Sequence, residues 1–277
     1  MKRSDNMKRR GDFHTHTTYS DGKFSVDELL EFAKGRVTHL AITDHDEIDG
    51  AIEAYSKAKD YGIELILGVE VSTYNKGESV HILGYYKDIN DMVKIQDFLK
   101  TQTEKRRKRL VVIRNRLKEY YDIDLDIEGL LQRSCVTRGS IAHEMFRQGL
   151  ITNVKEAFEK YIGHDCKAYV PVGHIETQAV INMLKESNAK VFLAHPVRFK
   201  HNTPYDIIPM GIDGMEARYS KNKSKDTRKY LRIARKEKLV VSAGSDFHLP
   251  DDYKHGDVGC VYLKGRELDR FLKFIKE

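Results

Sequence analysis

The sequence predicts an α/β fold of repeated βα units around a parallel sheet, interrupted by a helical insertion. Seven short apolar runs alternate with stretches of helical periodicity along most of the 277 residues, as is typical of βα units. The alternation stops from about residue 90 to residue 172, where the periodicity is almost entirely helical. We therefore expect a βα barrel formed by residues 11–90 and 173–277, a helical insertion at 91–172, and a disordered basic leader at 1–10.

The elements of the barrel can be placed from apolar runs and helix-end signals. In sequence order, the expected strands are GDFHTHT, THLAITDH, IELILGVEVS, SVHILGYY, KVFLAHP, GMEARYS and LVVSAGSDFH. Ser25 and Glu28 form a capping-box pattern at the start of the first helix, which Gly35 ends. A second helix covers residues 49–61 and stops at Gly62. Further helices are expected at 176–187, 224–237 and 266–276.

The insertion opens with a strongly basic helical run, TEKRRKRLVVIRNRLKEY. It continues with two further helical segments, SIAHEMFRQ, ended by Gly149, and NVKEAFEKYIG, ended by Gly163. The basic run contains five consecutive cations, Lys105 to Arg109. Such a run is usually a solvated helix face, and contact with a polyanionic substrate is the alternative.

Composition excludes several classes of protein. The cysteines Cys135, Cys166 and Cys260 give an odd count without CxxC spacing, so neither a disulfide framework nor a thiolate zinc site is expected. No apolar region follows the basic start, and no stretch of about eighteen apolar residues occurs. The net charge of +6 is compatible with an anionic substrate. We expect a cytoplasmic protein with no membrane segment and no obligate protein partner.

The first expected strand carries an unusual pair of histidines. In the stretch DFHTHTTYSDG, period-two alternation points His14 and His16 to the same face and Thr15 to the other. Asp21 follows five positions after His16. An isolated HxH is more simply explained by two half-exposed polar side chains, so this stretch alone does not establish a metal site.

Metal-ligating residue types recur at the ends of the other expected strands. LAITDH ends in Asp44 and His45, LILGVE reaches Glu70, SVHILGYY carries His81, VFLAHP ends in His195, and VSAGSDFH ends in Asp246 and His248. In a βα barrel the carboxyl ends of the strands converge on one rim, where active sites are built. Taken singly, each residue has an ordinary structural explanation, such as a core histidine or a carboxylate in a salt bridge. Their coincidence on one rim does not.

Such a cluster would leave unpaired buried charge unless cations filled it. Imidazole suits zinc, iron and manganese, and carboxylates can bridge two ions, so a set without thiolates indicates borderline divalent metals. Nine ligands are too many for one ion, and three ions sharing a bridging carboxylate would use them. The predicted metal ligands are His14, His16, Asp21, His45, Glu70, His81, His195, Asp246 and His248.

The motifs HTH, SDG, TDHD, GVE, HILGY, AHP and SDFH together resemble the PHP (polymerase and histidinol phosphatase) superfamily of metal-dependent phosphoesterases. The resemblance runs from residue 12 to about residue 255, and it implies a distorted seven-stranded βα barrel with a site for three metal ions. The donor types favour divalent manganese, iron or zinc. The resemblance implies that one ion is held by His14, His16, Glu70 and Asp246, a second by Asp21, His45 and His248, and a third by His81 and His195, with Glu70 as the bridge.

Within the superfamily the chain is similar to the small nucleotide phosphatases and 5′-to-3′ exoribonucleases, whose helical insertion caps the metal rim. In that subgroup the corresponding segment starts with Arg-Pro-His, whereas this chain has Arg138, Gly139 and Ser140, so the arginine is kept and the histidine is lost. The resemblance implies that Arg138 binds substrate phosphate. Arg198, three residues after His195, is a second candidate, for which an ordinary surface ion pair is the alternative.

These observations predict an enzyme that hydrolyses phosphate esters of nucleotides or short oligonucleotides. The expected nucleophile is a metal-bridging hydroxide, because coordination lowers the pKa of water from about 15.7 to about 7, and no catalytic side chain is assigned. Histidinol-phosphate phosphatase is the first alternative. A metal-dependent amidohydrolase, whose barrel also begins with HxH, would leave Asp21, His81 and His248 without roles. The last alternative is a non-catalytic RNA-binding protein that uses the basic helix at 105–109.

Overall fold

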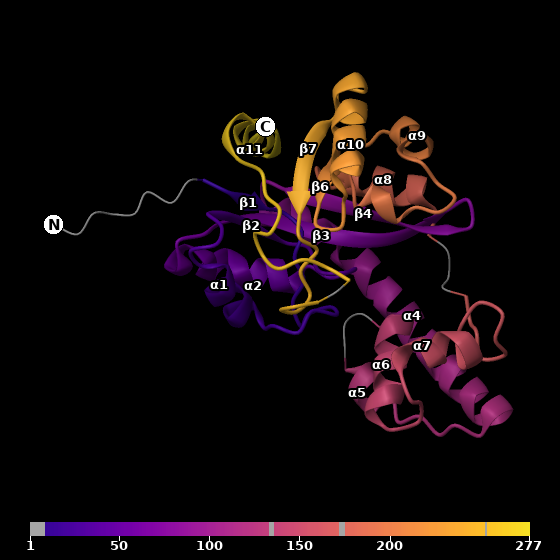
Figure 1. Ribbon diagram of the computed structural model, residues 1–277. Coiled ribbons are helices and arrows are strands. Elements are labelled where there is room, and N and C mark those ends of the chain that lie inside the picture. Colours follow the sequence, from indigo (N-terminus) through magenta and orange to yellow (C-terminus); the bar gives the residue numbers. More distant parts are fainter. Residues whose placement is uncertain (1–8, 133–135, 172–174, 253) are drawn as a thin grey trace. The chain divides into compact units, whose positions relative to one another are not determined.

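The protein is described by a computed structural model that covers residues 9–132, 136–171, 175–252 and 254–277 (Figure 1). The predicted disorder of the leader falls mainly on residues 1–8, which lie outside the described residues. The chain divides into two compact units. The first comprises Met1–Gln96 and Ile175–Glu277, and the second comprises Asp97–His174. The sequence bounds of the second unit differ by a few residues from those of the insertion expected at 91–172.

The first unit is a seven-stranded sheet that curls into a nearly closed barrel, which confirms the predicted α/β fold class. The strands are hydrogen-bonded in sequence order. Backbone hydrogen bonds also join the ends of the sheet, since Phe13 donates to the Ala243 carbonyl at 2.9 Å and Asp246 donates to that of His14 at 2.8 Å. The strands are β1 (Gly11–Asp12), β2 (His39–Ile42), β3 (Glu64–Asn75), β4 (Glu78–Tyr86), β5 (Lys190–Leu193), β6 (Gly214–Tyr219) and β7 (Val240–Gly244).

Strand β4 corrects the expectation of an all-parallel sheet. It pairs antiparallel with both β3 and β5, whereas the other neighbouring pairs are parallel. The reversal follows from a two-residue hairpin loop, Lys76 and Gly77, whose φ angles are both positive, at 47° and 77°. The expectation that His81 ends its strand is therefore wrong. His81 lies near the start of β4, and the reversal of the strand brings this start to the rim, where the His81 carbonyl accepts from the Ala194 amide at 3.1 Å.

The helices of the first unit follow the helix-end signals of the sequence. Ser25 and Glu28 form a complete capping box at the start of α1, and Gly35 follows its end with a φ of 74°. The predicted second helix becomes a 3-10 turn at Ala58–Tyr61 before Gly62. The α-helices are α1 (Val26–Ala33), α2 (Asp49–Lys57), α3 (Ile89–Met92), α8 (Thr177–Glu186), α9 (Pro204–Ile207), α10 (Ser224–Lys236) and α11 (Gly265–Lys276).

Helix α11 closes the amino-terminal end of the barrel, opposite the rim. Lys276 pairs with Glu64 at the start of β3 at 2.8 Å, which fixes the end of the helix there. Its apolar face joins the core inside the barrel, where the ring of Phe271 stacks on that of Phe13 with centroids 4.1 Å apart. Since this end is filled with side chains, the carboxyl-terminal rim is where polar residues gather.

We expect Phe271→Ala to destabilise the protein by about 3–5 kcal/mol, because it removes a fully buried ring and leaves a cavity that the barrel cannot collapse to fill. The urea midpoint of unfolding measures this loss. Tyr55→Ala is the matched control, because Tyr55 is 47% exposed and its loss should change stability by less than about 0.5 kcal/mol. Equal effects of the two substitutions would contradict the role given to α11.

The second unit is helical, with its own apolar core. The α-helices are α4 (Gln96–Tyr121), α5 (Glu128–Leu131), α6 (Arg138–Arg147) and α7 (Val154–Glu156). Gly149 follows α6 with a φ of 71°, as its position in the sequence predicts. The third predicted helix is α only in its first turn, because Ala157–Tyr161 forms a π turn before Gly163. In the core, Leu110, Ile113 and Leu117 of α4 meet apolar residues of the other helices.

Of the helices in the described ranges, none has a stretch that is long and apolar enough to cross a membrane.

Candidate metal centre

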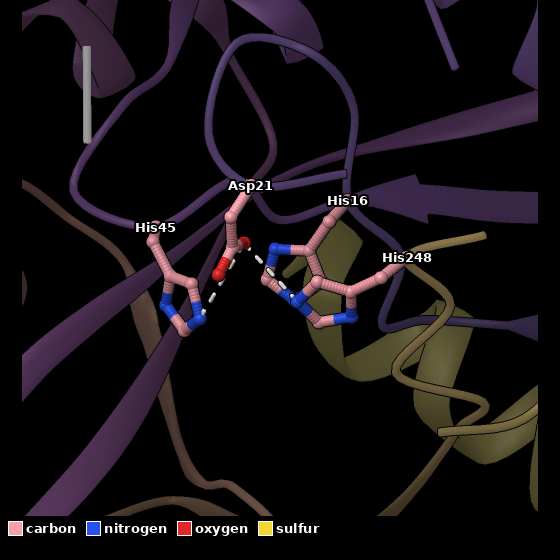
Figure 2. Close-up of side chains that lie close together, drawn as sticks. All are labelled: His16, Asp21, His45 and His248. Carbon is pink, nitrogen blue, oxygen red and sulfur yellow. Dashed lines mark ion pairs between the residues drawn. The ribbon is translucent and has the colours of Figure 1, made fainter. Parts of the chain in front are cut away.

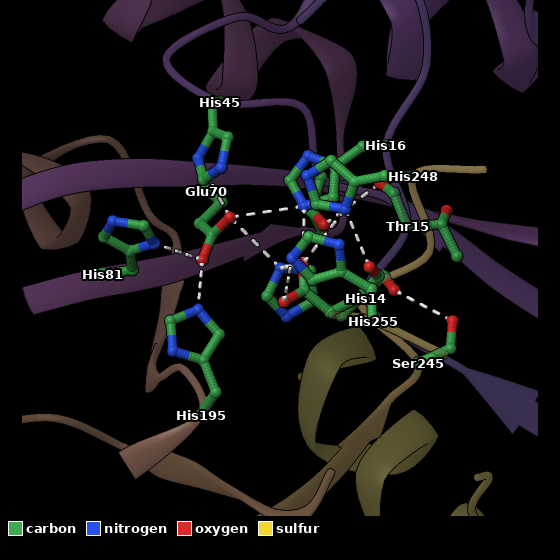
Figure 3. Close-up of polar contacts among 12 residues, drawn as sticks. His14, Thr15, His16, His45, Glu70, His81, His195, Ser245, His248 and His255 are labelled. Atoms are coloured by element: carbon green, nitrogen blue, oxygen red, sulfur yellow. Dashed lines mark hydrogen bonds and ion pairs between the residues drawn. The ribbon is translucent and has the colours of Figure 1, made fainter. Parts of the chain in front are cut away.

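The predicted metal ligands come together at the carboxyl-terminal rim of the barrel, although they are spread over more than two hundred positions of the sequence. Figure 2 and Figure 3 together label all of them except Asp246. Most lie in the segments that directly follow a strand. Glu70 lies within β3 and His81 within β4. Their role as metal ligands stays a prediction.

The two histidines of the HTH motif face the interior together, as alternation predicts. Their ring centroids lie 5.1 Å apart, and both side chains are fully buried. Thr15 faces the other way, and its hydroxyl donates to the Ala41 carbonyl at 2.8 Å. The backbone of this segment is held by the segment that follows β7, because the His16 amide donates to the Phe247 carbonyl at 2.8 Å.

Glu70 lies at the middle of the cluster, where five imidazoles surround one buried carboxylate. Its Oε2 lies 3.1 Å from Nε2 of His14, 3.3 Å from Nε2 of His16 and 3.0 Å from Nδ1 of His45. Its Oε1 lies 3.0 Å from Nδ1 of His81 and 2.9 Å from Nε2 of His195. The two oxygens therefore face two different groups of histidines, as a bridging carboxylate must.

Asp21 forms a second centre at the edge of the cluster, with His16, His45 and His248 (Figure 2). Its Oδ1 lies 3.1 Å from Nε2 of His248 and 4.0 Å from Nε2 of His45. The ring of His248 stacks on that of His16 with centroids 4.2 Å apart. Nδ1 of His248 donates to the Asp246 carbonyl at 2.8 Å, which directs Nε2 toward Asp21.

Asp246 completes the group around the HTH motif. Its Oδ1 lies 3.4 Å from Nε2 of His14 and 3.2 Å from Nε2 of His16. Its Oδ2 accepts from the Tyr219 hydroxyl at 2.9 Å. Asp246 has a φ of 56° and His195 a φ of 23°, a left-handed backbone that non-glycine residues rarely adopt. Strain of this kind concentrates at functional sites.

The donor atoms of this cluster fit divalent cations. Five buried atoms that could ligate a metal have no hydrogen-bond partner within the described ranges: Nε2 of His14, Nε2 of His16, Nδ1 of His45, Oδ1 of Asp21 and Oε2 of Glu70. Buried polar atoms are normally satisfied, so such a convergence needs an explanation. Nitrogen and carboxylate oxygen donors without a thiolate match zinc, iron or manganese.

The grouping of these atoms parallels the three predicted ligand sets. Among the residues that the structure describes, four groups have potential ligand atoms within 4.8 Å of one another. They are His14, His16, Glu70 and Asp246; His16, Asp21, His45 and His248; His45, Glu70 and His81; and Asp246, His248 and His255. The first group has the same members as one predicted set, and the second adds His16 to another. His195 is not a member of the third group, but its Nε2 lies 2.9 Å from Oε1 of Glu70 and its ring centroid lies 5.1 Å from that of His81.

The negative charges of the clustered carboxylates are balanced by positive charges on the histidines around them. Burial lowers the pKa of His14, but the carboxylates around it, Glu70 first, outweigh burial and raise the pKa well above its usual value. Burial raises the pKa of Glu70, but its histidine neighbours hold it well below its usual value. Burial lowers the pKa of His195 to about 4. Protons on some imidazoles therefore offset the carboxylates, and cations would replace those protons.

Comparison with known proteins identifies the family. Residues 12–168 match the PHP domain. The chain belongs to the PHP domain family. It is 35% identical to a 5′-3′ exoribonuclease of Haemophilus influenzae over 88% of this chain and 92% of that protein. It is 33% identical to the 5′-3′ exoribonuclease Rnm of Escherichia coli over 86% of this chain and 85% of that protein. It is 27% identical to a 3′,5′-nucleoside bisphosphate phosphatase of Chromobacterium violaceum over 87% of this chain and 88% of that protein.

Solved structures share the fold of this chain over almost its whole length. A protein of Bifidobacterium adolescentis named as a metal-dependent phosphoesterase superposes with a TM-score of 0.81 at 25% identity, over 95% of both chains. A Chromobacterium violaceum protein named as an amidohydrolase, with bound sulfate, superposes with a TM-score of 0.80 at 26% identity, over 96% of both chains. The PHP resemblance is thus confirmed, and the chain is a metal-dependent phosphoesterase, a hydrolase of phosphoric esters with a cluster able to bind metals.

Glu216 is a residue of the PHP site that sequence reasoning missed. It lies in β6, fully buried, with Oε1 3.1 Å from Nδ1 of His14 and Oε2 accepting from the His195 amide at 2.8 Å. It thereby directs Nε2 of His14 into the cluster. Gly244 makes room for it, because a Cβ at that position would lie 2.1 Å from Oε1. The signal was a lone acidic residue in GMEARYS, the one expected strand without a predicted ligand.

Asp44 and His255 also contribute to the site without being predicted ligands. The Asp44 carboxylate accepts from the Thr17 amide at 2.7 Å and from the Ser20 hydroxyl at 2.5 Å, which fixes the loop that carries Asp21. The feature of the sequence that could have indicated this role of Asp44 was its position just after β2. His255 stacks on His248 with centroids 4.0 Å apart, and nothing in its surrounding sequence indicated this.

The two arginines predicted to bind phosphate lie in different units. Arg198 lies on the turn after His195, with Nη2 3.2 Å from Oδ2 of Asp246 and its guanidinium 5.4 Å from the centre of the Tyr219 ring. It is thus part of the rim. Arg138 begins α6 in the second unit, 5.2 Å from the centre of the Tyr169 ring. For both, contact with substrate stays a prediction.

Proposed function

We propose that this phosphoesterase removes mononucleotides from the 5′ end of short 5′-phosphorylated RNA. The largely buried cluster of nine predicted ligands, five of whose buried polar atoms have no hydrogen-bond partner within the described ranges, carries the proposal. Relatives named as 5′-3′ exoribonucleases, which align over most of this chain at 33–35% identity, support the choice of substrate. The relative named as a nucleoside bisphosphate phosphatase supports dephosphorylation of a 3′,5′-bisphosphate as the second candidate.

The ligand sets proposed for three ions follow the grouping of the donor atoms. His14, His16, Glu70 and Asp246 would hold one ion, Asp21, His45 and His248 a second, and His81 and His195 a third, with Glu70 shared. Divalent ions of this kind acidify water and neutralise charge on phosphoryl oxygens. Manganese, iron and zinc match these donors.

The side chains of the rim would bind and orient the phosphoester. Arg198 is held by Asp246 and faces the Tyr219 ring, so its guanidinium is positioned before substrate arrives. Its planar fork can donate two parallel hydrogen bonds to phosphate oxygens. Because the Asp246 carboxylate would also serve as a ligand, Arg198 would couple the position of the phosphate to the metal cluster.

A group of arginines in the second unit would bind a further phosphate. Burial, together with the nearby charges of Arg138 and Arg106, lowers the pKa of Arg109 to about 10. Nε of Arg109 donates to the Val170 carbonyl at 2.8 Å, but its buried Nη2 has no hydrogen-bond partner within the described ranges. Cations packed together in this way favour an anion between them. This supports the predicted phosphate contact of Arg138.

The test is an assay of purified protein with added Mn²⁺ on a 5′-phosphorylated RNA pentamer, the same RNA with a 5′-hydroxyl, a nucleoside 3′,5′-bisphosphate and histidinol phosphate. We expect stepwise release of mononucleotides from the 5′-phosphorylated RNA and no activity after chelation. Hydrolysis of the bisphosphate with intact RNA would instead favour the second candidate. Metal-loaded protein that hydrolyses none of the four substrates would contradict both.

A further inference from the structure

Helix α10 and its flanking residues form one of two strongly basic segments of this chain, the other being the run at 105–118 in the second unit. The segment 221–238, KNKSKDTRKYLRIARKEK, contains nine lysines and arginines against two acidic residues. Its net charge of +7 exceeds the +6 of the whole chain. A dense run of one sign of charge on one element of the barrel indicates an electrostatic role for that element.

The cations of α10 form one exposed stripe. At 3.6 residues per turn, six of them fall within an arc of about 120° around the helix axis. The opposite face packs on the barrel through Tyr230, Ile233 and Ala234, which are buried. The stripe consists of Lys225, Arg228, Lys229, Arg232, Arg235 and Lys236, and all six side chains are exposed.

In the part of the chain that the structure describes, acidic partners are almost absent from this stripe, although several other cations on the barrel have them. Within the described ranges, no carboxylate forms an ion pair with the first five residues of the stripe, and Lys236 is 3.6 Å from its neighbour Glu237. Elsewhere, Lys57 pairs with two carboxylates, and Lys276 and Arg218 each pair with one. Like charges three and four residues apart on a helix repel. The stripe therefore suits an external polyanion better than it suits the isolated protein.

The stripe begins close to the metal rim and leads away from it. Strand β6 ends at Tyr219, whose hydroxyl donates to Asp246 in the cluster. Lys221 and Lys223 lie in the short connection from there to α10. The helix then runs back along the outside of the barrel (Figure 1). With a rise of 1.5 Å per residue, its thirteen residues span about 18–20 Å, long enough to follow several nucleotides.

We propose that α10 binds the sugar–phosphate backbone of single-stranded RNA while the 5′ end of that RNA lies at the metal centre. This inference rests on the proposed function and adds a site for the nucleotides downstream of the one being released. Lysine and arginine contacts to phosphates give affinity without sequence preference, as a nuclease that advances along its substrate requires. An anionic membrane fits α10 less well, because the apolar face of the helix is buried and cannot insert.

The experiment compares two double charge reversals with the same spacing. R228E/R232E changes the stripe, and R266E/R270E changes an exposed arginine pair on α11, at the opposite end of the barrel. Each protein is assayed on 5′-phosphorylated RNA of three and of twenty nucleotides. For R228E/R232E we expect KM on the longer RNA to rise about tenfold, with kcat unchanged. The plot of log binding constant against log salt concentration should become less steep, its slope changing by about 1.4. The trimer and the control variant should show no such change.

Binding is also measured by anisotropy with a 3′-labelled, phosphorothioate-linked 20-nucleotide RNA, and thermal melting confirms that each variant is folded. If R228E/R232E weakens RNA binding, the result would support RNA binding by α10 even if no RNA is hydrolysed. This separates the inference from the proposed function. Equal KM changes on both RNA lengths, equal effects of the two variants, or unaltered RNA binding would overturn it. So would α10-dependent binding to phosphatidylserine vesicles without binding to RNA.

Discussion

Glu70→Gln is expected to lower the rate of phosphoester hydrolysis by about a thousandfold, since several kcal/mol of charge stabilisation corresponds to roughly that factor. Gln keeps the shape of the side chain but loses the negative charge that five imidazoles share. One of the two oxygens also becomes an amide nitrogen, which cannot ligate as the carboxylate does. We therefore expect fewer divalent ions per chain by elemental mass spectrometry, together with the loss of turnover.

Glu64→Gln is the matched control, because Glu64 lies on the same strand at the opposite end of the barrel, where it pairs with Lys276. This variant should keep its metal content and its rate. A Glu70→Gln protein that retains both full metal content and normal turnover would contradict the proposed bridging role. Thermal melting separates these outcomes from unfolding, since a folded variant must keep a cooperative transition.

The gathering of these histidines and carboxylates at the rim could be predicted from the sequence because the signal is local. Each buried strand is a short apolar run, and a histidine or carboxylate placed where that run stops, such as His195 or Asp246, must lie at the rim if the strands are parallel. Helix ends were equally local, since Ser25, Glu28 and Gly35 specify a helix within ten residues. These features depend on chain geometry over a few residues and not on the packing of distant segments.

The antiparallel direction of β4 could also have been predicted from a short stretch of sequence. The expectation of repeated βα units instead favoured a parallel strand. The stretch YNKGES between two apolar runs contains a glycine suited to a two-residue hairpin loop, and it leaves no room for a crossover helix. Taken alone, it predicts an antiparallel neighbour for β3. The position of His81 at the rim therefore follows from the hairpin and not from the rule for parallel strands.

Other features could not be predicted because they arise from packing between segments far apart in the chain. That Glu70 faces both groups of histidines depends on the register between β3 and its neighbours. The contact between His14 and Glu216 joins residues 202 positions apart and exists only once the barrel closes. The lack of acidic partners for α10 likewise depends on which surfaces lie beside it. A sequence pattern specifies faces, and the fold decides which faces meet.

Glu216→Gln is expected to weaken metal binding by about 10–100-fold, as is typical when the carboxylate behind a ligating histidine is lost. The single carbonyl oxygen of Gln cannot accept from both Nδ1 of His14 and the amide of His195, so one of these donors must face the new NH₂ group. The imidazole of His14 then loses its fixed tautomer and orientation. The affinity is measured by competition with a chelator of known strength.

The decisive readout is the response to excess metal. If Glu216 acts by positioning His14, high Mn²⁺ should restore most of kcat in the Gln variant, because the predicted ligands themselves remain. It should not restore activity to Glu70→Gln, which lacks a ligand. A Glu216→Gln protein with normal metal affinity, or with a low kcat that excess Mn²⁺ leaves unchanged, would contradict a positioning role. Because Glu216 bonds to both the HTH segment and the turn of His195, this test also asks whether one buried carboxylate aligns two parts of the metal centre.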